Sequence, residues 1–424
     1  MTKKAFAPCP KELCCYCGAC VAVCPRGALT LKPSGGAFIV EWHAALCTNC
    51  GVCEQVCPSR ELDIHQMQRN VWALDPRNLF VGPVLQAGYG WAVDHDLRAN
   101  SQSGGLLSGI LAFLLARHVI DGAIVVTTLE GDPLHPLPFL ATSNSHLLQA
   151  QGSKYCPVPT ARMIEHIMKW EGRFAFVGLP CQILALRKAE LLFPNLKAKV
   201  ALRLGLFCAG MWKFGLLDHL MRVAGVHSWQ AWRGWPGDTE IELVDGDTEY
   251  IDRFHRQIVR DLFLPLRCFY CHDKLNTLAD VSFGDPWGLA LEYHDQRSTA
   301  FLIRSEEGSR VMEQAAQSKS IELQMVETDL VVEGQSGTPY RRDFSSRLRA
   351  AERLRKLPPL YLQACPSGAE REDKVRASAI ADVIWHHFSS SDRMQRIWTV
   401  IPARVTELVS KSFGLCRGLF RRLE

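Results

Sequence analysis

The stretch CCYCGACVAVCP (residues 14–25), followed after a spacer by CTNCGVCEQVCP (residues 47–58), decides the architecture of this 424-residue chain. Each half has the spacing C-x2-C-x2-C-x3-C-P, which holds one [4Fe-4S] cluster with three thiolates and lends the fourth to a neighbouring cluster. We therefore predict crossed ligand sets. Cluster 1 would be held by Cys14, Cys17, Cys20 and Cys57, and cluster 2 by Cys47, Cys50, Cys53 and Cys24.

Zinc and disulfides are the simpler interpretations of so many cysteines. Zinc sites use two pairs of ligands and seldom a run of four with a trailing proline. Disulfides need an oxidising compartment and follow no such spacing. The stretch resembles a bacterial two-cluster ferredoxin over residues 9 to about 66, and Cys9 and Cys15 lie outside its pattern as spectators.

Composition excludes several classes of protein. The length suggests two or three domains, and 47% apolar residues allow a sizeable core. The net charge of +4 and the absence of a basic, aromatic-interleaved stripe argue against nucleic-acid binding. The N-terminus MTKKAFAPCP has no apolar signal region, so 17 cysteines with ligand spacing indicate a reducing cytoplasm. The apolar run 105–116 is shorter than the roughly 20 residues of a membrane span, which favours a buried helix.

Elements alternate between strand and helix after residue 85. QAGYGWAVD (86–94) is typical of a strand, and a Ser/Gly loop at 101–105 leads into a helix that ends near His118. This pattern predicts α/β structure. The further expected elements are strands at 123–128, 174–177, 199–207 and 300–304, helices at 161–170, 182–190 and 309–316, and an antiparallel insertion at 226–262.

We therefore predict an α/β (α+β) catalytic domain with a mixed sheet, preceded by a small ferredoxin-like domain and followed by a helical segment. The expected ranges are 1–66 for the ferredoxin-like domain, 67–84 for a linker, 85–335 for the catalytic domain and 336–424 for the helical extension.

A second set of cysteines is scattered along the catalytic domain: Cys181, Cys208, Cys268 and Cys271. Cys181 and Cys208 follow predicted strands, and carboxyl ends of parallel strands share one rim where ligands bind. Four thiols gathered there could hold a third cluster. The alternative is that they are ordinary buried cysteines, a common fate of this residue.

Seven motifs together resemble the coenzyme F420 hydrogenase/dehydrogenase beta-subunit family over roughly residues 85–310: QSGG (102–105), IDGAIV (120–125), GSKY (152–155), VGLPCQI (177–183), GLFC (205–208), CFYC (268–271) and LADVSFGDPWG (278–288). The family includes F420-reducing hydrogenase and formate dehydrogenase beta subunits and 7-hydroxymethyl chlorophyll a reductase. The resemblance implies FAD and a third [4Fe-4S] cluster on the second set of cysteines. The GDPWG loop departs from the F420-hydrogenase members and is similar to a bacterial branch found beside surface-polysaccharide genes.

Flavin binding is also suggested by the residues. The Ser103-Gly104-Gly105 loop precedes an apolar helix whose N-terminus could receive a pyrophosphate, although glycine before a helix is often only a turn. Lys154 could neutralise a phosphate or the reduced flavin, or could be a solvated surface lysine. Trp287 is a stacking wall or plain core. The candidate cofactor-binding residues are Ser103, Gly104, Gly105, Gly152, Ser153, Lys154, Tyr155, Gly178, Gln182, Gly284, Asp285 and Trp287.

Clusters pass single electrons and a flavin exchanges one or two, so the expected protein is an iron–sulfur flavoprotein oxidoreductase. Reduced ferredoxin or F420H2 would be the electron partner and a small organic molecule the substrate, and assembly into an oligomer is expected from the family. The alternatives are an electron-transfer subunit with no substrate chemistry of its own and a redox sensor without flavin. The catalytic candidates are His272 and Lys154, with His118 and His135 as further proton donors.

Residues 397–423 place apolar residues at helical spacing beside five basic residues. This pattern suggests a basic amphipathic helix that binds an anionic membrane or a partner. The usual alternative is a terminal helix docked on the chain's own core.

Overall fold

The computed structural model describes residues 8–34, 36–60, 64–74, 78–129, 132–226, 229–233, 239–243, 245–251, 262–288, 297–354 and 377–389, with residues 405, 408 and 412. In these ranges no helix has both the length and the apolar character needed to cross a membrane. The apolar run that begins at Gly105 forms helix α5 (Leu106–Ala116), most of whose side chains are buried. This confirms the expected buried helix.

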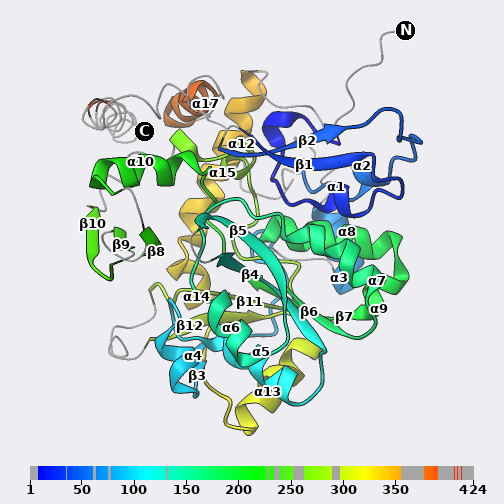
Figure 1. Ribbon diagram of the computed structural model, residues 1–424, viewed down its shortest axis with the longest axis vertical. Coiled ribbons are helices and arrows are strands. Elements are labelled where there is room, and N and C mark those ends of the chain that lie inside the picture. Colours follow the sequence, from blue (N-terminus) through cyan, green and yellow to red (C-terminus); the bar gives the residue numbers. More distant parts are fainter. Residues whose placement is uncertain are drawn as a thin grey trace.

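A mixed sheet of eight strands forms the centre of the fold (Figure 1), in the order β13-β3-β12-β11-β7-β6-β4-β5. The inner strands β11, β7, β6 and β4 are parallel, and the others pair antiparallel. The carboxyl ends of the parallel strands therefore meet at one edge of the sheet. The bounds are β3 Gln86–Ala92, β4 Gly122–Leu129, β5 Asp132–Ala141, β6 Phe174–Gly178, β7 Val200–Leu206, β11 Val281–Gly284, β12 Thr299–Ile303 and β13 Ile321–Val326.

Helices cover both faces of this sheet, because successive residues of a strand point to opposite faces. In β6, Phe174 and Phe176 belong to one apolar core, and Ala175 and Val177 belong to the other. Helices α7, α8 and α9 contribute to the first core, whereas α5 and α13 contribute to the second. The bounds are α4 His95–Ala99, α6 Asn144–Ala150, η2 Thr160–Met163, α7 Ile164–Lys169, α8 Pro180–Leu192, α9 Pro194–Lys199 and α13 Glu306–Gln317.

The ferredoxin-like part lies against the α7 and α8 side of the sheet (Figure 1, blue). Its buried residues Ala19 and Val56 belong to the same apolar core as Ile164 and Ala185 of the catalytic domain. The two parts therefore share one core. The bounds are η1 Lys11–Leu13, α1 Ala19–Ala22, β1 Leu29–Ser34, β2 Ala37–Trp42 and α2 Val52–Gln55, with β1 and β2 forming an antiparallel hairpin.

The segment expected to be a linker at 67–84 contains most of a docked helix, α3 (Ile64–Trp72). Gln68 is fully buried and its Nε2 donates to Leu79 O at 3.0 Å and to Thr277 Oγ1 at 3.1 Å. Trp72 Nε1 donates to Thr277 O at 3.0 Å. The linker interpretation is therefore wrong for this helix, because its polar side chains bond to the catalytic domain.

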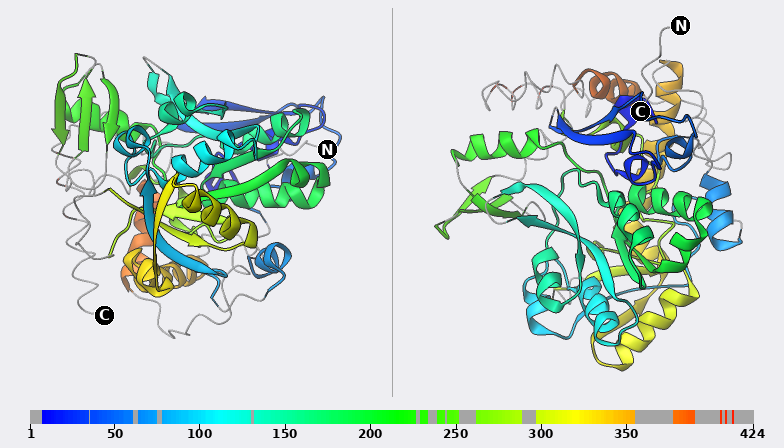
Figure 2. Two further views of the ribbon diagram at one scale, coloured as in Figure 1. Left: turned by 90° about the horizontal axis from the view of Figure 1, so that it is seen from below. Right: turned by 45° about the vertical axis from the view of Figure 1, so that its right-hand side comes forward.

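The predicted antiparallel insertion is a separate three-stranded sheet that stands at one end of the molecule (Figure 2, left, green). Of the described residues after β13, 328–334, 337–353 and 377–389 are helical. The amphipathic tail predicted at 397–423 lies outside the described residues, apart from residues 405, 408 and 412. The remaining bounds are α10 Gly215–Ala224, β8 Trp229–Arg233, β9 Thr239–Leu243, β10 Thr248–Ile251, α12 Leu266–Phe269, α14 Thr328–Gly334, α15 Gly337–Arg353 and α17 Ala377–Ser389.

Candidate metal and cofactor sites

The four cysteines predicted for cluster 2 line one hollow near the surface. Cys24 comes from the first half of the motif and reaches Cys47, Cys50 and Cys53 of the second half. Gly51 has a left-handed φ of +73°, which lets the loop turn its sulfurs inward. Cys50 is exposed, so this hollow opens to solvent. The crossing of the fourth cysteine is thus present in the geometry.

The cysteines predicted for cluster 1 lie deeper. Burial raises the pKa of the Cys20 thiol well above its ordinary value, and the neighbouring Cys14 and Cys57 raise it further. Cys57 therefore joins the first half of the motif, as the crossed assignment requires. Gly18 has φ +84°, and a Cβ there would lie 3.1 Å from the side chains of Arg162 and Pro159. A residue with a side chain would push this loop away from the catalytic domain.

Cys9 and Cys15, expected to be spectators, are both buried between other cysteines. The neighbouring side chains of Cys14 and Cys57 raise the pKa of the Cys9 thiol. The neighbouring side chains of Cys17 and Cys181 lower the pKa of the Cys15 thiol. Cys15 therefore joins the first ferredoxin loop to the second set of cysteines.

The second set of cysteines gathers at the carboxyl edge of the sheet. Cys181 lies in the first turn of α8 directly after β6, and Cys208 follows the neighbouring strand β7. Cys268 lies on α12 and Cys271 follows it. Burial and the nearby Cys271 raise the pKa of Cys208 to about 12. The nearby Cys208 and Cys268 both raise the pKa of Cys181. The structure therefore brings these four residues together at the carboxyl edge of the sheet.

A single buried amide holds this edge in shape. Asn276 Nδ2 donates to Gly178 O at 2.9 Å and to Leu206 O at 3.2 Å, which are the last residues of β6 and β7. Cys208 N donates to Lys274 O at 2.9 Å. A Cβ on Gly205 would lie 2.4 Å from Asn276, so glycine is required there. The loop that carries Cys271 is thereby tied to both strand ends.

Each of the three groups offers four thiols, the donor set that a [4Fe-4S] cluster uses. Within the described ranges, no three His, Cys, Asp or Glu side chains are arranged to hold a single metal ion. A four-iron cluster is a larger body whose ligands bind different corners, so the residues present fit a cluster better than an isolated ion.

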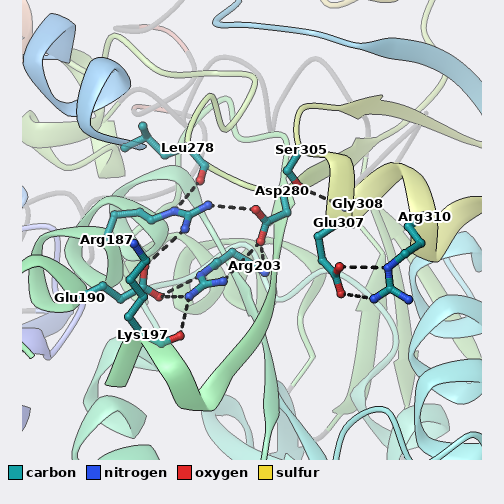
Figure 3. Close-up of polar contacts among 10 residues, drawn as sticks. All are labelled: Arg187, Glu190, Lys197, Arg203, Leu278, Asp280, Ser305, Glu307, Gly308 and Arg310. Atoms are coloured by element: carbon teal, nitrogen blue, oxygen red, sulfur yellow. Dashed lines mark hydrogen bonds and ion pairs between the residues drawn. The ribbon is translucent and has the colours of Figure 1, made fainter. Parts of the chain in front are cut away.

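A buried ion network joins α8, β7 and the residue before β11 (Figure 3). Glu190 of α8 lies 2.7 Å from Arg203 Nη2 of β7 and 3.4 Å from Arg187 Nη1 of its own helix. Asp280, just before β11, accepts from Arg187 Nη2 at 3.1 Å and from Arg203 N at 2.8 Å. Arg187 Nε also donates to Leu278 O at 3.0 Å. The elements that carry Cys181, Cys208 and the loop after Cys271 are therefore locked to one another.

The segments predicted to contact flavin converge beside the same edge. Ser103 donates its hydroxyl to the Asp285 carboxylate, directly after β11. Gln102 Nε2 donates to the Tyr155 hydroxyl, and Gln102 Oε1 accepts from Ser153 N at 3.0 Å. Burial raises the pKa of Asp285, and the Ser103 hydrogen bond opposes this rise. Three segments distant in sequence thus form one surface.

The glycines of the first segment have a packing reason of their own. A Cβ on Gly104 would lie 2.7 Å from Gly90 O, and one on Gly105 would lie 2.6 Å from Leu97 O. Gly104 N donates to Thr299 Oγ1 at 2.9 Å. This amide is engaged within the chain, which corrects the expectation that it faces a phosphate.

Lys154 is half-buried beside this surface, and its Nζ donates to Gln151 O at 2.8 Å. Burial lowers the pKa of Lys154 to about 8. The solvated-lysine alternative is therefore wrong for the described conformation. Gly152 before it has φ +84°, and Tyr155 after it packs its ring 5.5 Å from that of Trp212.

Matches to family models agree with this arrangement. The model described as "4Fe-4S dicluster domain" matches residues 13–60. The models for the N-terminal and C-terminal parts of the coenzyme F420 hydrogenase/dehydrogenase beta subunit match residues 87–165 and 171–329. The chain belongs to the coenzyme F420 hydrogenase/dehydrogenase beta-subunit family. It is thus a member of an electron-transfer oxidoreductase family and carries an iron–sulfur domain.

Individual relatives of this family show how far the likeness extends. A subunit of the F(420)H(2) dehydrogenase of Methanosarcina mazei is 29% identical over 294 residues, which is 64% of this chain and 75% of the relative. The beta subunit of the coenzyme F420 hydrogenase of Methanothermobacter thermautotrophicus is 25% identical, covering 56% of this chain and 83% of the relative. The F420-reducing [NiFe] hydrogenase complex of Methanosarcina barkeri contains a chain of the same fold, with TM-score 0.52 and 21% identity over 63% of this chain and 95% of that one.

Three expected flavin contacts of this beta-subunit family member have partners or close packing within the chain. Gln182 is buried, its Oε1 accepts from Leu179 N at 2.8 Å and its Nε2 donates to Val158 O at 2.8 Å. Gln182 therefore caps α8. Gly178 receives Asn276 on its carbonyl, and a Cβ on Gly284 would lie 2.2 Å from Phe207. Both glycines are explained by packing.

Trp287 is 37% exposed, so it is not a core residue. Its carbonyl oxygen would lie 1.7 Å from a Cβ on Gly334, which fixes the backbone of this loop against α14. The indole remains a candidate stacking surface beside Asp285.

The expected proton donors do not form a catalytic group. His272 is buried against Phe344 of α15, and burial with the nearby charge of Arg267 lowers its pKa to about 3. Burial thus disfavours the protonated form of this candidate proton donor. His118 is an exposed residue with φ +53° after α5, and His135 packs 5.3 Å from Phe214. Neither lies in the segments that meet at Asp285.

Residues that pattern reasoning missed are mostly charged and buried. Arg187, Glu190, Arg203 and Asp280 are each 5–8% exposed, and Arg267 is 2% exposed. No ligand spacing marks them, because most of their partners lie on different elements and the Arg187–Glu190 pair on α8 is the exception. The only signal was charge within otherwise apolar segments, which is rare unless the charge is paired.

Gln182→Ala tests the capping role. Losing the cap and the bond to Val158 is expected to lower the free energy of unfolding by about 1–2 kcal/mol, measured by denaturant unfolding. FAD bound per chain should stay at the wild-type level. Gln314→Ala on the exposed face of α13 is the control and should change stability by less than about 0.5 kcal/mol. Loss of flavin with unchanged stability would restore Gln182 as a cofactor contact.

Proposed function

We propose that the protein is an oxidoreductase with three [4Fe-4S] clusters and one FAD, which couples one-electron carriers to a two-electron substrate. The observation that carries this proposal is that Cys15 of the first ferredoxin loop belongs to the buried core cluster against which Cys181 of the second set packs. When bound, clusters supply single-electron steps and flavin exchanges one or two electrons. The chain's residues hold these groups in sequence and exclude water between them.

The burial of the cysteines supports an order for the path. The cluster 2 hollow opens to solvent at Cys50, whereas Cys17 and Cys57 of cluster 1 are buried. Electrons would therefore enter at the cluster 2 hollow and move inward past Cys15 to the second set.

A chain of bonds joins the second set to the candidate flavin surface. Cys208 N donates to Lys274 O, Lys274 Nζ donates to Gln335 O, and Gln335 Nε2 donates to Asp285 O at 2.6 Å. The Asp285 carboxylate in turn accepts a hydrogen bond from the Ser103 hydroxyl. This short connection favours flavin as the group that receives electrons from the third cluster.

The names of the relatives support F420H2 as the electron partner. Reduced ferredoxin is the second candidate partner, and a small organic molecule is the proposed substrate. A second candidate function is an electron-transfer subunit without substrate chemistry. It is favoured because several relatives are named as subunits of larger enzymes.

Anaerobic rapid mixing separates these functions. Purified protein is mixed with reduced ferredoxin or with F420H2, and flavin bleaching near 450 nm is followed alone and with candidate acceptors. Repeated turnover by the isolated chain supports the oxidoreductase, whereas flavin reduction without turnover supports the electron-transfer role. Absence of flavin after anaerobic purification overturns both.

Lys154 gives a pH dependence to flavin binding. Its pKa of about 8 leaves it mostly protonated at pH 7 and mostly neutral at pH 9. A phosphate or reduced flavin prefers the protonated amine, so FAD affinity is expected to fall about tenfold from pH 7 to pH 9, measured by fluorescence quenching. Lys154→Arg should hold the pH 7 affinity across this range, and Lys154→Met should be weak throughout. An equal slope in all three proteins would remove Lys154 from the site.

A further inference from the structure

Arg267 is a buried cation that lies between the two groups of cysteines. It is the second residue of α12, next to Cys268, and is only 2% exposed. Pro265 precedes the helix, and α12 lies against η1 of the ferredoxin-like part. An arginine in such a position is unusual, because burial of a charge is costly unless opposite charge compensates it.

The contacts of Arg267 reach both groups. Its Nη2 donates to Pro58 O at 3.3 Å, and Pro58 directly follows Cys57 of the cluster 1 set. Burial raises the pKa of the Cys271 thiol of the second set, and the nearby charge of Arg267 opposes this rise. Its positive charge lowers the pKa of the Cys15 thiol, which lies between the two sets. One guanidinium therefore faces sulfurs from both sides of the boundary.

Two other buried arginines are paired with carboxylates. Glu190 and Asp280 lie within 3.1 Å of Arg203 and Arg187, respectively. Around Arg267 the structure brings cysteine sulfurs instead. A [4Fe-4S] cluster with four thiolates is anionic and gains a further negative charge on reduction, so a nearby fixed cation stabilises the reduced form.

We propose that Arg267 is a positioning residue that raises the reduction potential of the third cluster, so that this cluster accepts electrons from cluster 1. This inference rests on the proposed third cluster. It adds the residue that favours electron transfer from cluster 1 into that cluster. Arg267 stabilises the extra electron by charge, and its fork also joins Pro58 to the turn that carries Cys271.

A purely structural tie between the two parts is the competing explanation. It depends on the shape and hydrogen bonds of the guanidinium, whereas the electrostatic role depends on charge. Arg267→Lys keeps the charge and loses the fork, and Arg267→Met keeps much of the length and loses the charge. Arg267→Gln is a second neutral variant that keeps a hydrogen-bond donor, in case the methionine variant does not assemble.

Arg347→Met is the matched control. Arg347 on α15 also touches α12, since its Nη1 donates to Phe269 O at 3.1 Å and its guanidinium lies 5.0 Å from the Phe269 ring. This substitution removes a positive charge that contacts the same helix and leaves Arg267 in place.

The experiment is an anaerobic redox titration of the full chain followed by electron paramagnetic resonance, with iron counted per chain in each variant. At the potential where the wild-type third cluster is half reduced, the neutral variants are expected to show an about tenfold lower ratio of reduced to oxidised cluster, or about 59 mV for one electron. Arg267→Lys and Arg347→Met should stay within about threefold of wild type.

A neutral variant with full iron and the wild-type ratio would overturn the electrostatic role. Loss of about four irons from the lysine and neutral variants alike would also overturn it, in favour of a structural tie. These outcomes differ from failure of the proposed function, in which the wild-type chain itself holds about eight irons and gives no third signal.

Discussion

Replacing Glu190 by glutamine is expected to lower the free energy of unfolding by about 3–5 kcal/mol. Glu190 is 5% exposed and holds Arg203 at 2.7 Å and Arg187 at 3.4 Å. Glutamine has nearly the same shape but no charge, so it leaves two buried guanidinium groups with Asp280 as their remaining carboxylate in the network. The measurement is urea unfolding under anaerobic conditions, with circular dichroism as the probe.

Glu307→Gln is the control for this network (Figure 3). Glu307 pairs with Arg310 at 2.5 Å in the first turns of α13, with side chains 38% and 50% exposed. An exposed pair is worth less than about 1 kcal/mol, so this variant should remain close to wild type. Equal effects of the two substitutions would show that the buried network does not support the edge of the sheet.

Replacing Cys208 by serine is expected to remove the third cluster and to stop reduction of the flavin from the ferredoxin side. Cys208 follows β7 and lies beside Cys268 and Cys271. Serine is a poor ligand for iron in place of a thiolate, so iron should fall by about four per chain. The ferredoxin clusters should remain and should still be reduced by dithionite.

The control for this variant is Cys156→Ser. Cys156 is also buried, with burial raising its pKa to about 12, but it belongs to none of the three predicted ligand sets. It should keep the wild-type iron content and the wild-type rate of flavin reduction. Unchanged iron in Cys208→Ser would contradict the third ligand set.

Short-range patterns predicted which cysteines lie near one another. The crossed pairing of Cys24 and Cys57 follows from the repeated spacing, and the hollow that Cys24 shares with Cys47 has that arrangement. The meeting of Cys181 and Cys208 follows from their place after two parallel strands, since β6 and β7 are neighbours in the sheet. These outcomes depend on local chemistry and on one rule of sheet geometry.

Features decided by tertiary contact were not predictable in the same way. β5 contains Pro133, Pro136 and Pro138, which argue against a strand, yet it lies at the edge of the sheet where missing N–H donors are tolerated. α3 was taken for a linker because its docking depends on Thr277, over 200 residues away. The bridging position of Cys15 likewise depends on how the ferredoxin-like part packs against α8.

Anaerobic cofactor analysis of the wild-type chain tests the central claim most directly. Iron and acid-labile sulfide are counted per chain, and released flavin is identified by chromatography. Three clusters and one flavin predict about twelve irons, about twelve sulfides and one FAD. About eight irons without flavin would leave only the ferredoxin-like clusters and would contradict the proposed path from the Cys50 hollow to Asp285.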